Sequence, residues 1–141
     1  MKTPKKVGIA VLAVAVLAGF LTGAKKDQTI KIGFNIPLTG DSPKVGEGSK
    51  FSGELIKNEI NAKGGLEVGG KKYLLDFIYV DNELKADSAI QAAYKLIDQD
   101  KVLASIGPDG SGRAIPAGQV YNDEKTPMIS PWATNSAVTK D

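Results

Sequence analysis

A glycine-rich loop, residues 107–113, holds the residues of this sequence best suited to bind a ligand. It follows an apolar run that predicts a buried strand over residues 102–106, and it precedes a helix expected over residues 113–124. The free N–H groups at a helix N-terminus favour a negatively charged or carboxylate-bearing ligand. Glycines also occur at such turns for conformational reasons alone. The loop by itself therefore leaves a binding role and a purely structural role open.

A second polar loop, residues 130–135, follows the next apolar run in the same way. Ligands of open parallel α/β sheets bind beyond the carboxyl ends of the strands, so the two loops are expected at one edge. Both loops carry hydroxyl groups next to a turn or a helix start. Trp132 is either a packing residue or part of a cleft, since indole offers a large apolar face to a small ligand.

Known catalytic and phosphate-binding motifs do not fit the first loop. Arg113 and Ala114 stand where a Walker loop needs Lys and Ser or Thr, and Ile115 takes the third glycine position of a dinucleotide fingerprint. Asp109 takes the first glycine position of a nucleophile elbow around Ser111. The chain also has no cysteine and no histidine, which removes thiol and imidazole catalysis and the usual zinc ligands. We therefore expect no enzyme activity, no metal and no cofactor.

An acidic turn, residues 81–83, follows another predicted strand. Such a cluster is either a metal or phosphoacceptor site or a set of solvated turn residues. The second interpretation is the commoner one, because short acidic motifs match by chance.

The N-terminal segment has the pattern of a secretory signal. Lys2, Lys5 and Lys6 precede an uncharged apolar stretch over residues 7–21, which is shorter than the roughly 20 residues of a membrane span. Residues 1–24 are therefore predicted to be a signal peptide, the alternative being a stable N-terminal anchor. Ala24 stands where a bacterial lipoprotein signal has its lipidated cysteine, so we expect an exported protein without a lipid anchor.

Removal of that signal changes the charge of the chain. Of 18 basic residues three belong to the signal, which leaves 15 against 16 acidic residues and a net charge of −1 for residues 25–141. The sequence therefore gives no electrostatic argument for nucleic-acid binding.

The remaining pattern alternates between strands and helices. Strands are expected over residues 30–36, 73–80, 102–106 and 126–129, helices over 46–63, 86–97 and 113–124, and a turn over 67–72. This order predicts an α/β fold, with a parallel sheet between two layers of helices as in Rossmann-like domains. In the first helix, the pattern predicts a Glu59–Lys63 ion pair, an end at Gly64–Gly65, and one apolar face formed by Phe51, Leu55, Ile56 and Ile60. Asp87 is expected in the first turn of the second helix, where it suits the helix dipole. In the third helix, Pro116 is expected in the first turn, and the apolar contacts are expected from Ile115, Val120 and Tyr121.

Several motifs carry a family resemblance. Residues 32–34, 37–40, 59–65 and 127–135 resemble the branched-chain amino-acid (leucine/isoleucine/valine) binding proteins of bacterial ABC transporters, which are type I periplasmic binding proteins. The resemblance runs over residues 29–141. It implies two Rossmann-like lobes that close on an amino acid, of which residues 25–141 form an incomplete N-terminal lobe, as in a truncated chain or a fragment.

The resemblance also implies a set of binding residues. The Ser111 hydroxyl and neighbouring backbone N–H groups would hold a ligand carboxylate. The backbone carbonyl of Trp132 and the side chain of Thr134 would hold the ammonium, with the Thr134 N–H assisting at the carboxylate. The expected ligand-binding residues are Gly110, Ser111, Trp132, Ala133 and Thr134.

The function implied by this resemblance is binding of a branched-chain or related amino acid outside the cytoplasm, for uptake through ABC permease subunits. The protein is expected to be a monomer. Val45 replaces an aromatic residue that often covers the ligand in this family, which leaves the exact amino acid open. A ligand-sensing domain of a signalling system is the alternative, and a carboxylate- or metal-dependent enzyme of the same fold class is a remoter one.

Overall fold

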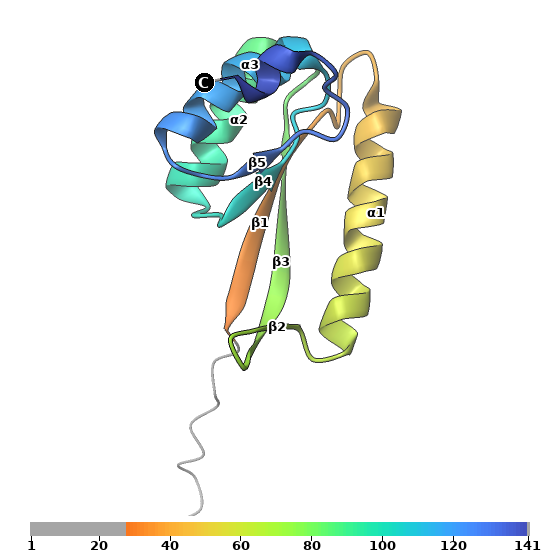
Figure 1. Ribbon diagram of the computed structural model, residues 1–141. Coiled ribbons are helices and arrows are strands. Elements are labelled where there is room, and N and C mark those ends of the chain that lie inside the picture. Colours follow the sequence, from red (N-terminus) through yellow and green to blue (C-terminus); the bar gives the residue numbers. More distant parts are fainter. Residues whose placement is uncertain (1–27, 141) are drawn as a thin grey trace, which may run out of the picture.

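The computed structural model describes residues 28–140, which form a five-stranded sheet flanked by helices (Figure 1). The predicted signal peptide, residues 1–24, lies outside the described residues. The elements in chain order are β1 (Thr29–Ile36), α1 (Pro43–Ala62), β2 (Leu66–Val68), β3 (Lys71–Asp81), α2 (Ala86–Tyr94), the π-helical turn η1 (Lys95–Gln99), β4 (Ala104–Ile106), α3 (Ser111–Asp123), β5 (Met128–Ile129) and the 3-10 helix η2 (Ser136–Thr139).

The sheet has the order β2-β3-β1-β4-β5, and all neighbours except β2 and β3 are parallel. Helix α1 lies on one side of it, and α2 and α3 lie on the other (Figure 1). The predicted α/β fold with a mainly parallel, Rossmann-like sheet is therefore confirmed. The carboxyl ends of β1, β3, β4 and β5 share one edge, from which the two polar loops emerge.

The core between the sheet and the α2–α3 pair is built from small residues and one large aromatic. Ala89 and Ala93 of α2 pack with Ala117, Val120 and Tyr121 of α3. Alanines at this spacing let the two helices pack closely against each other and against the sheet. The apolar periodicity of the second predicted helix is thus confirmed, with Asp87 in its first turn.

Buried polar side chains connect this core to the strands through hydrogen bonds. Asn35 of β1 donates to the carbonyl of Ala89 at 2.8 Å and accepts from Asn82 at 3.1 Å. The hydroxyls of Ser105 and Tyr121 are 2.9 Å apart. Each of these side chains is almost fully buried, so the hydrogen bonds offset the cost of removing polar groups from water.

Helix α1 approaches the sheet and the loop after β1 through glycines rather than through Phe51 and Leu55. A Cβ atom at Gly46 would lie 1.9 Å from the carbonyl oxygen of Pro37, and one at Gly53 would lie 2.8 Å from the Tyr79 hydroxyl. Phe51 and Leu55 are 72% and 62% exposed. The apolar face predicted for α1 is therefore largely exposed, with Ile56 52% exposed as well, and the helix makes its close approach through glycines.

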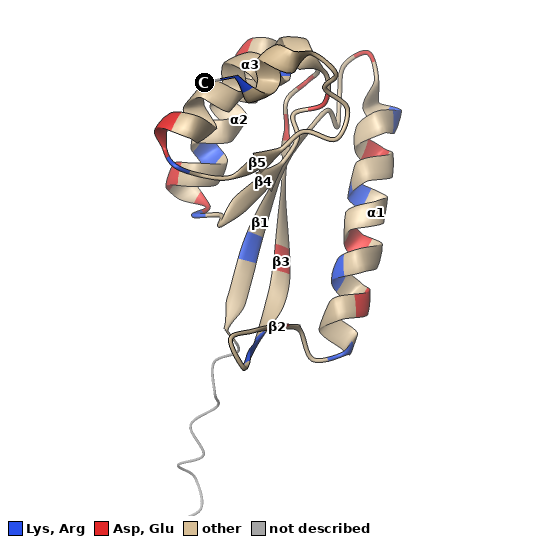
Figure 2. Cartoon of the chain, viewed as in Figure 1, with Lys and Arg blue, Asp and Glu red and all other residues tan. Residues whose placement is uncertain are grey.

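Charged residues of both signs alternate along α1 (Figure 2). The predicted pair of Lys63 and Glu59 is present at 2.6 Å, and Lys57 lies 2.8 Å from Glu54. These pairs lie on the surface or partly so, and pairs of this kind contribute little to stability. The helix ends at Ala62 as expected, with positive φ angles at the two following glycines.

Three further expectations are corrected. The turn expected over residues 67–72 is shorter, because Leu66–Val68 forms β2 and pairs antiparallel with the start of β3. Helix α3 begins at Ser111, so Pro116 is its sixth residue and lies in the second turn rather than the first. Ile115 is 39% exposed, while Ala114 is fully buried. Within residues 28–140, no helix is long and apolar enough to cross a membrane.

Candidate functional site

Ser111 links the two polar loops. Its hydroxyl oxygen accepts hydrogen bonds from the backbone N–H groups of Thr134 at 3.2 Å and Asn135 at 3.1 Å. Ser111 is the first residue of α3, and Gly110 caps that helix with φ 70° and ψ 139°. The parallel strands bring the loops together because β4 and β5 are neighbours in the sheet.

These contacts determine what the Ser111 hydroxyl can still do. A serine hydroxyl has two acceptor lone pairs and one O–H donor. Thr134 and Asn135 occupy both acceptor positions, and no acceptor for the O–H is found among residues 28–140. The proton is therefore available to a ligand, beside the N-terminus of α3, where the helix dipole favours negative charge.

The first loop is fixed to the sheet and to the second loop. The Gly107 N–H donates to the carbonyl of Ile129 at 2.8 Å, and the Ser130 hydroxyl donates to the carbonyl of Pro108. Gly107 has φ 89°, and a Cβ atom there would lie 2.2 Å from the carbonyl oxygen of Asn35. Glycine is required at this position, because any side chain would collide with the backbone of β1.

A partly buried ion pair lies in the same loop. Arg113 donates through Nε to the carbonyl oxygen of Asp109 at 2.9 Å, and its Nη2 lies 3.4 Å from the Asp109 carboxylate. Asp109 is 8% exposed, and its Oδ1 atom has no hydrogen-bond partner. Sequence reasoning missed this pair, although an acid four residues before a base is a known helix-stabilising spacing.

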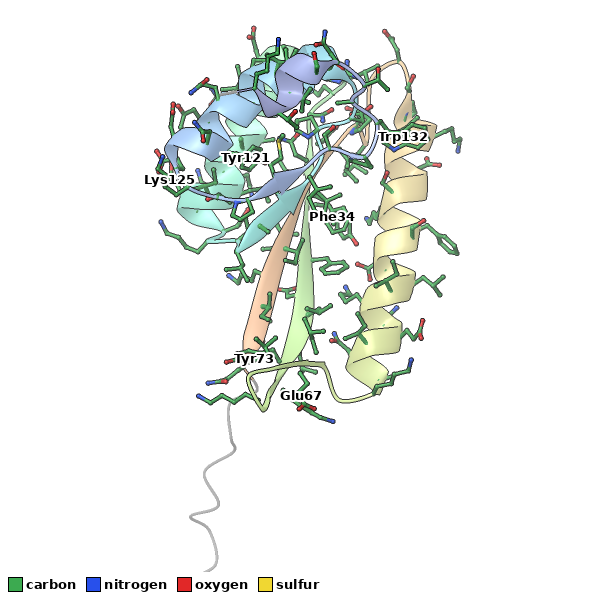
Figure 3. The ribbon with its side chains drawn as sticks, in the orientation of Figure 1. Phe34, Glu67, Tyr73, Tyr121, Lys125 and Trp132 are labelled. Carbon is green, nitrogen blue, oxygen red and sulfur yellow. The ribbon has the colours of Figure 1, made fainter. Side chains whose placement is uncertain are left out.

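Trp132 borders an apolar cavity on the α1 side of the sheet. The cavity has a volume of about 710 Å³, and its lining includes Phe34, Val45, Phe77, Ile106, Pro131 and Trp132. The tryptophan is 62% exposed. Figure 3 shows its side chain beside the N-terminal end of α1. The cleft-lining interpretation of Trp132 thus has a geometric basis, since the residue is not packed in the core.

Ala133 and Thr134 border a different, smaller hollow of about 440 Å³ near β5. The structure therefore brings Gly110, Ser111 and Thr134 together, and it places Trp132 at the boundary with the apolar cavity. Ala133 is half-buried and Thr134 is exposed.

The acidic turn serves as an anchor for the loop after β1. Asp81 accepts hydrogen bonds from the backbone N–H groups of Leu38, Thr39 and Glu83 and from the Thr39 hydroxyl. Burial by itself raises the pKa of Asp81, but these hydrogen bonds outweigh it and hold the pKa below its usual range. Among the described residues, no group of three acidic, cysteine or histidine side chains could hold a metal ion.

Comparison with known proteins gives a consistent result. The sequence profile of a family described as "Periplasmic binding protein" matches residues 29–141. The chain is 35% identical over 133 residues to an "Amino acid binding protein" of Pseudomonas aeruginosa, which covers 94% of this chain and 34% of that protein. It is 38% identical over 131 residues to "Leu/Ile/Val-binding protein homolog 7" of Brucella melitensis, which covers 93% of this chain and 31% of that protein. It thus spans about a third of the length of these relatives.

Solved structures are similar as well. The branched-chain amino acid transporter substrate binding protein LivJ of Streptococcus pneumoniae, in complex with isoleucine, has 34% identity and a TM-score of 0.71, over 79% of this chain and 31% of that one. A solute binding protein of an ABC transporter from Rhodopseudomonas palustris, in complex with 3,4-dihydroxy benzoic acid, has 31% identity and a TM-score of 0.63, over 79% and 29%. The proteins named here are binding proteins rather than enzymes.

Proposed function

The chain belongs to the periplasmic binding protein family, and on that premise we propose that it binds a small carboxylate-bearing solute outside the cytoplasm for uptake by an ABC transporter. The solute class is an amino acid or a related carboxylate. In this proposal residues 25–141 form part of an N-terminal lobe, residues 1–24 direct export, and permease subunits are the protein partners.

The two hydrogen bonds that the Ser111 oxygen accepts are the observation that carries the proposal, because they leave its O–H to donate to a ligand. A ligand carboxylate placed there accepts from this hydroxyl, and the two N–H groups that donate to its oxygen polarise the O–H further. Hydrogen bonds to a charged group contribute about 1.5–3 kcal/mol each. Gly110 and the first turn of α3 add partial positive charge from the helix N-terminus.

The second loop supplies the complementary group. The Trp132 carbonyl and the Thr134 hydroxyl are suited to accept from a ligand ammonium, and Ala133 sets the spacing between them. The ligands of the two similar structures support a carboxylate as the shared feature. Isoleucine and 3,4-dihydroxy benzoic acid both carry a carboxylate, but only isoleucine carries an ammonium group.

A matched pair of ligands tests the proposal. The ¹⁵N-labelled chain is titrated with L-leucine and with L-leucinamide, in which a neutral amide replaces the carboxylate. We expect leucine to shift the backbone amide signals of Ser111, Thr134 and Asn135, and leucinamide to leave them unchanged. Equal shifts with both compounds, or none with leucine and other amino acids, would contradict carboxylate recognition at this site.

A further inference from the structure

We infer that Arg113 is a positioning residue for the ligand site: its side chain closes the turn that carries Ser111, and this fixes the hydroxyl proposed to donate to a ligand carboxylate. The part of the inference that concerns ligand affinity rests on the proposed function. The part that concerns the turn rests on contacts within the chain, so the two parts can be tested separately.

The Arg113 side chain folds back over the residues that precede it. Its Nε donates to the carbonyl oxygen of Asp109 at 2.9 Å, and its backbone N–H donates to the carbonyl of Gly110 at 3.2 Å. A Cβ atom at Gly110 would collide with Nη2 of Arg113, so the guanidinium occupies the space beside that glycine. Residues 109–113 are thus closed into a turn, with Ser111 at its centre.

Ser111 needs such a constraint because a glycine stands on each side of it. Gly110 has φ 70°, and a Cβ atom at Gly112 would meet nothing within 4 Å. Glycine has more accessible backbone conformations than other residues, so its neighbours in sequence do not fix the orientation of Ser111. The hydrogen bond from the side chain of residue 113 to the carbonyl of residue 109 spans both glycines and restricts them together.

The loop is anchored at both of its ends. Gly107 and Pro108 are hydrogen-bonded to β5 and to the residue that follows it. At the other end, Ala114 of α3 is fully buried. Ser111 lies between these anchors, where the structure gives it two N–H groups from the second loop and the turn closed by Arg113. The Arg113 side chain therefore acts on the least anchored part of the loop.

The ion pair itself is poorly suited to stabilise the fold. Asp109 is 8% exposed, and Nη2 of Arg113 lies 3.4 Å from its Oδ2. Its Oδ1 atom is buried without a hydrogen-bond partner among the described residues. A buried carboxylate with an incomplete set of hydrogen bonds costs desolvation free energy that a distant partner does not fully return. The geometry therefore favours a role in fixing the turn over a role in stability.

Direct contact between Arg113 and the ligand is the competing role. A guanidinium has five N–H donors, and the contacts with Asp109 use two of them. We favour the positioning role because the Arg113 side chain is only 22% exposed, and because its recorded partners are atoms of Asp109. A Ser111→Ala background separates the two roles, since only a direct contact survives the loss of that hydroxyl.

Amide hydrogen exchange without ligand tests the turn. The N–H groups of Thr134 and Asn135 donate to the Ser111 oxygen, so their exchange with solvent reports on the position of that residue. Arg113→Met keeps an apolar stem but removes the hydrogen bond to the carbonyl of Asp109. We expect both amides to exchange about threefold to tenfold faster in this variant, the effect of one ordinary hydrogen bond.

Two further variants separate this effect from overall stability. In Asp109→Leu combined with Arg113→Met, apolar groups replace both charges, which commonly leaves a fold equally or more stable. We expect the urea midpoint to stay the same or rise, while the two amides still exchange faster. Asp109→Asn keeps the bond from Nε to the backbone carbonyl and is expected to keep the slow exchange. If exchange follows the urea midpoint across these variants, Arg113 acts through overall stability and the inference is overturned.

Titration of the ¹⁵N-labelled chain with L-leucine tests the effect on binding. We expect Arg113→Met to weaken leucine binding about threefold to tenfold, and to have no further effect in a Ser111→Ala background. Lys63→Met controls for the loss of one positive charge, because Lys63 is exposed and follows α1 at the end far from the two loops (Figure 1). A further loss of affinity in the Ser111→Ala background would show that Arg113 contacts the ligand directly, which contradicts a positioning role.

Failure of the proposed function gives a different result. If leucine and other amino acids shift no amide signal in the original chain, carboxylate binding fails, and the affinity part of the inference fails with it. The exchange rates of Thr134 and Asn135 still decide whether Arg113 fixes Ser111. Faster exchange in the double variant at an unchanged or higher urea midpoint supports that role, and unchanged exchange refutes it.

Discussion

The hydroxyl oxygen of Ser111 lies 3.2 Å from the backbone nitrogen of Thr134, although 23 residues separate them along the chain. The contact joins the N-terminus of α3 to the loop that follows β5. Because the oxygen accepts in this contact, the hydroxyl proton stays free to be donated to a ligand.

Substitution of Ser111 by alanine removes the acceptor of two N–H groups and the proposed donor to the carboxylate. Thr134 and Asn135 are exposed, so water replaces the lost acceptor and the unfolding free energy falls by only about 0.5–1.5 kcal/mol. Carboxylate binding is expected to weaken by about tenfold or more, since a charge-assisted hydrogen bond is lost. Calorimetric titration measures the affinity. Ser111→Thr retains the hydroxyl and serves as the control, and an unchanged affinity in Ser111→Ala would return this contact to a purely structural role.

The general position of this site could be predicted from sequence, but its contacts could not. Apolar runs ending in polar loops predict neighbouring strand ends, which is why Ser111 and Thr134 were expected close together. The hydrogen bond from a backbone N–H to a serine hydroxyl has no sequence signal. The start of α3 was also missed, because Gly110 and Gly112 lower the helix propensity around Ser111.

In the fold, too, some features could be predicted from the sequence and others could not. The apolar period of α2 correctly predicts that Ala89 and Ala93 are buried, since a helix packed on both sides needs small residues at regular intervals. The apolar residues predicted on one face of α1 are largely exposed in the structure, and the glycines through which the helix makes its close approach carry no hydrophobic signal. The hairpin that joins β2 to β3 was read as a turn alone, although two glycines between short strands are a known hairpin signal.

Glycine replacement in α1 tests its close contact with the loop that follows β1. Gly46→Ala is expected to lower the unfolding free energy by about 2 kcal/mol or more, because the new methyl group would overlap the Pro37 carbonyl. Gly48→Ala is the matched control in the same helix. Nothing lies within 4 Å of a Cβ atom there, so alanine is expected to stabilise the helix by about 0.5–1 kcal/mol. Urea unfolding followed by circular dichroism measures both, and equal effects at the two positions would refute the close packing.

The carboxylate of Asp81 makes stability depend on pH. Burial raises its pKa, but the hydrogen bonds from Thr39, Glu83 and Leu38 lower it by more, so the pKa in the folded state lies below the unfolded value of about 3.9. The stabilisation is therefore complete above the unfolded pKa and is lost as the pH falls through the folded one.

Asp81→Asn removes this effect, because an amide nitrogen cannot accept from the Thr39 hydroxyl. We expect the variant to be about 1–2 kcal/mol less stable than the original chain at pH 7, and the difference to shrink below about pH 4. Asp98→Asn, an exposed residue in the turn after α2, controls for the loss of one negative charge. Denaturant unfolding at a series of pH values gives the result, and a difference that stays constant down to pH 3 would show that Asp81 stabilises by packing alone.

The hydroxyl of Tyr121 is expected to matter chiefly through the partner that it leaves behind. It lies 2.9 Å from the Ser105 hydroxyl and 3.4 Å from Nδ2 of Asn35, and all three residues are at most 1% exposed. Tyr121→Phe leaves the Ser105 hydroxyl buried without a partner, which costs about 1–3 kcal/mol of unfolding free energy. Asn35 also loses its contact with the Tyr121 hydroxyl, but it keeps its hydrogen bond to the carbonyl of Ala89, so this second loss costs little. Combining Tyr121→Phe with Ser105→Ala removes both ends of the hydrogen bond and is expected to recover much of the stability, as a double-mutant cycle measures. If the two substitutions lower the unfolding free energy additively, the two hydroxyls do not interact, and β4 and α3 are held together by packing alone.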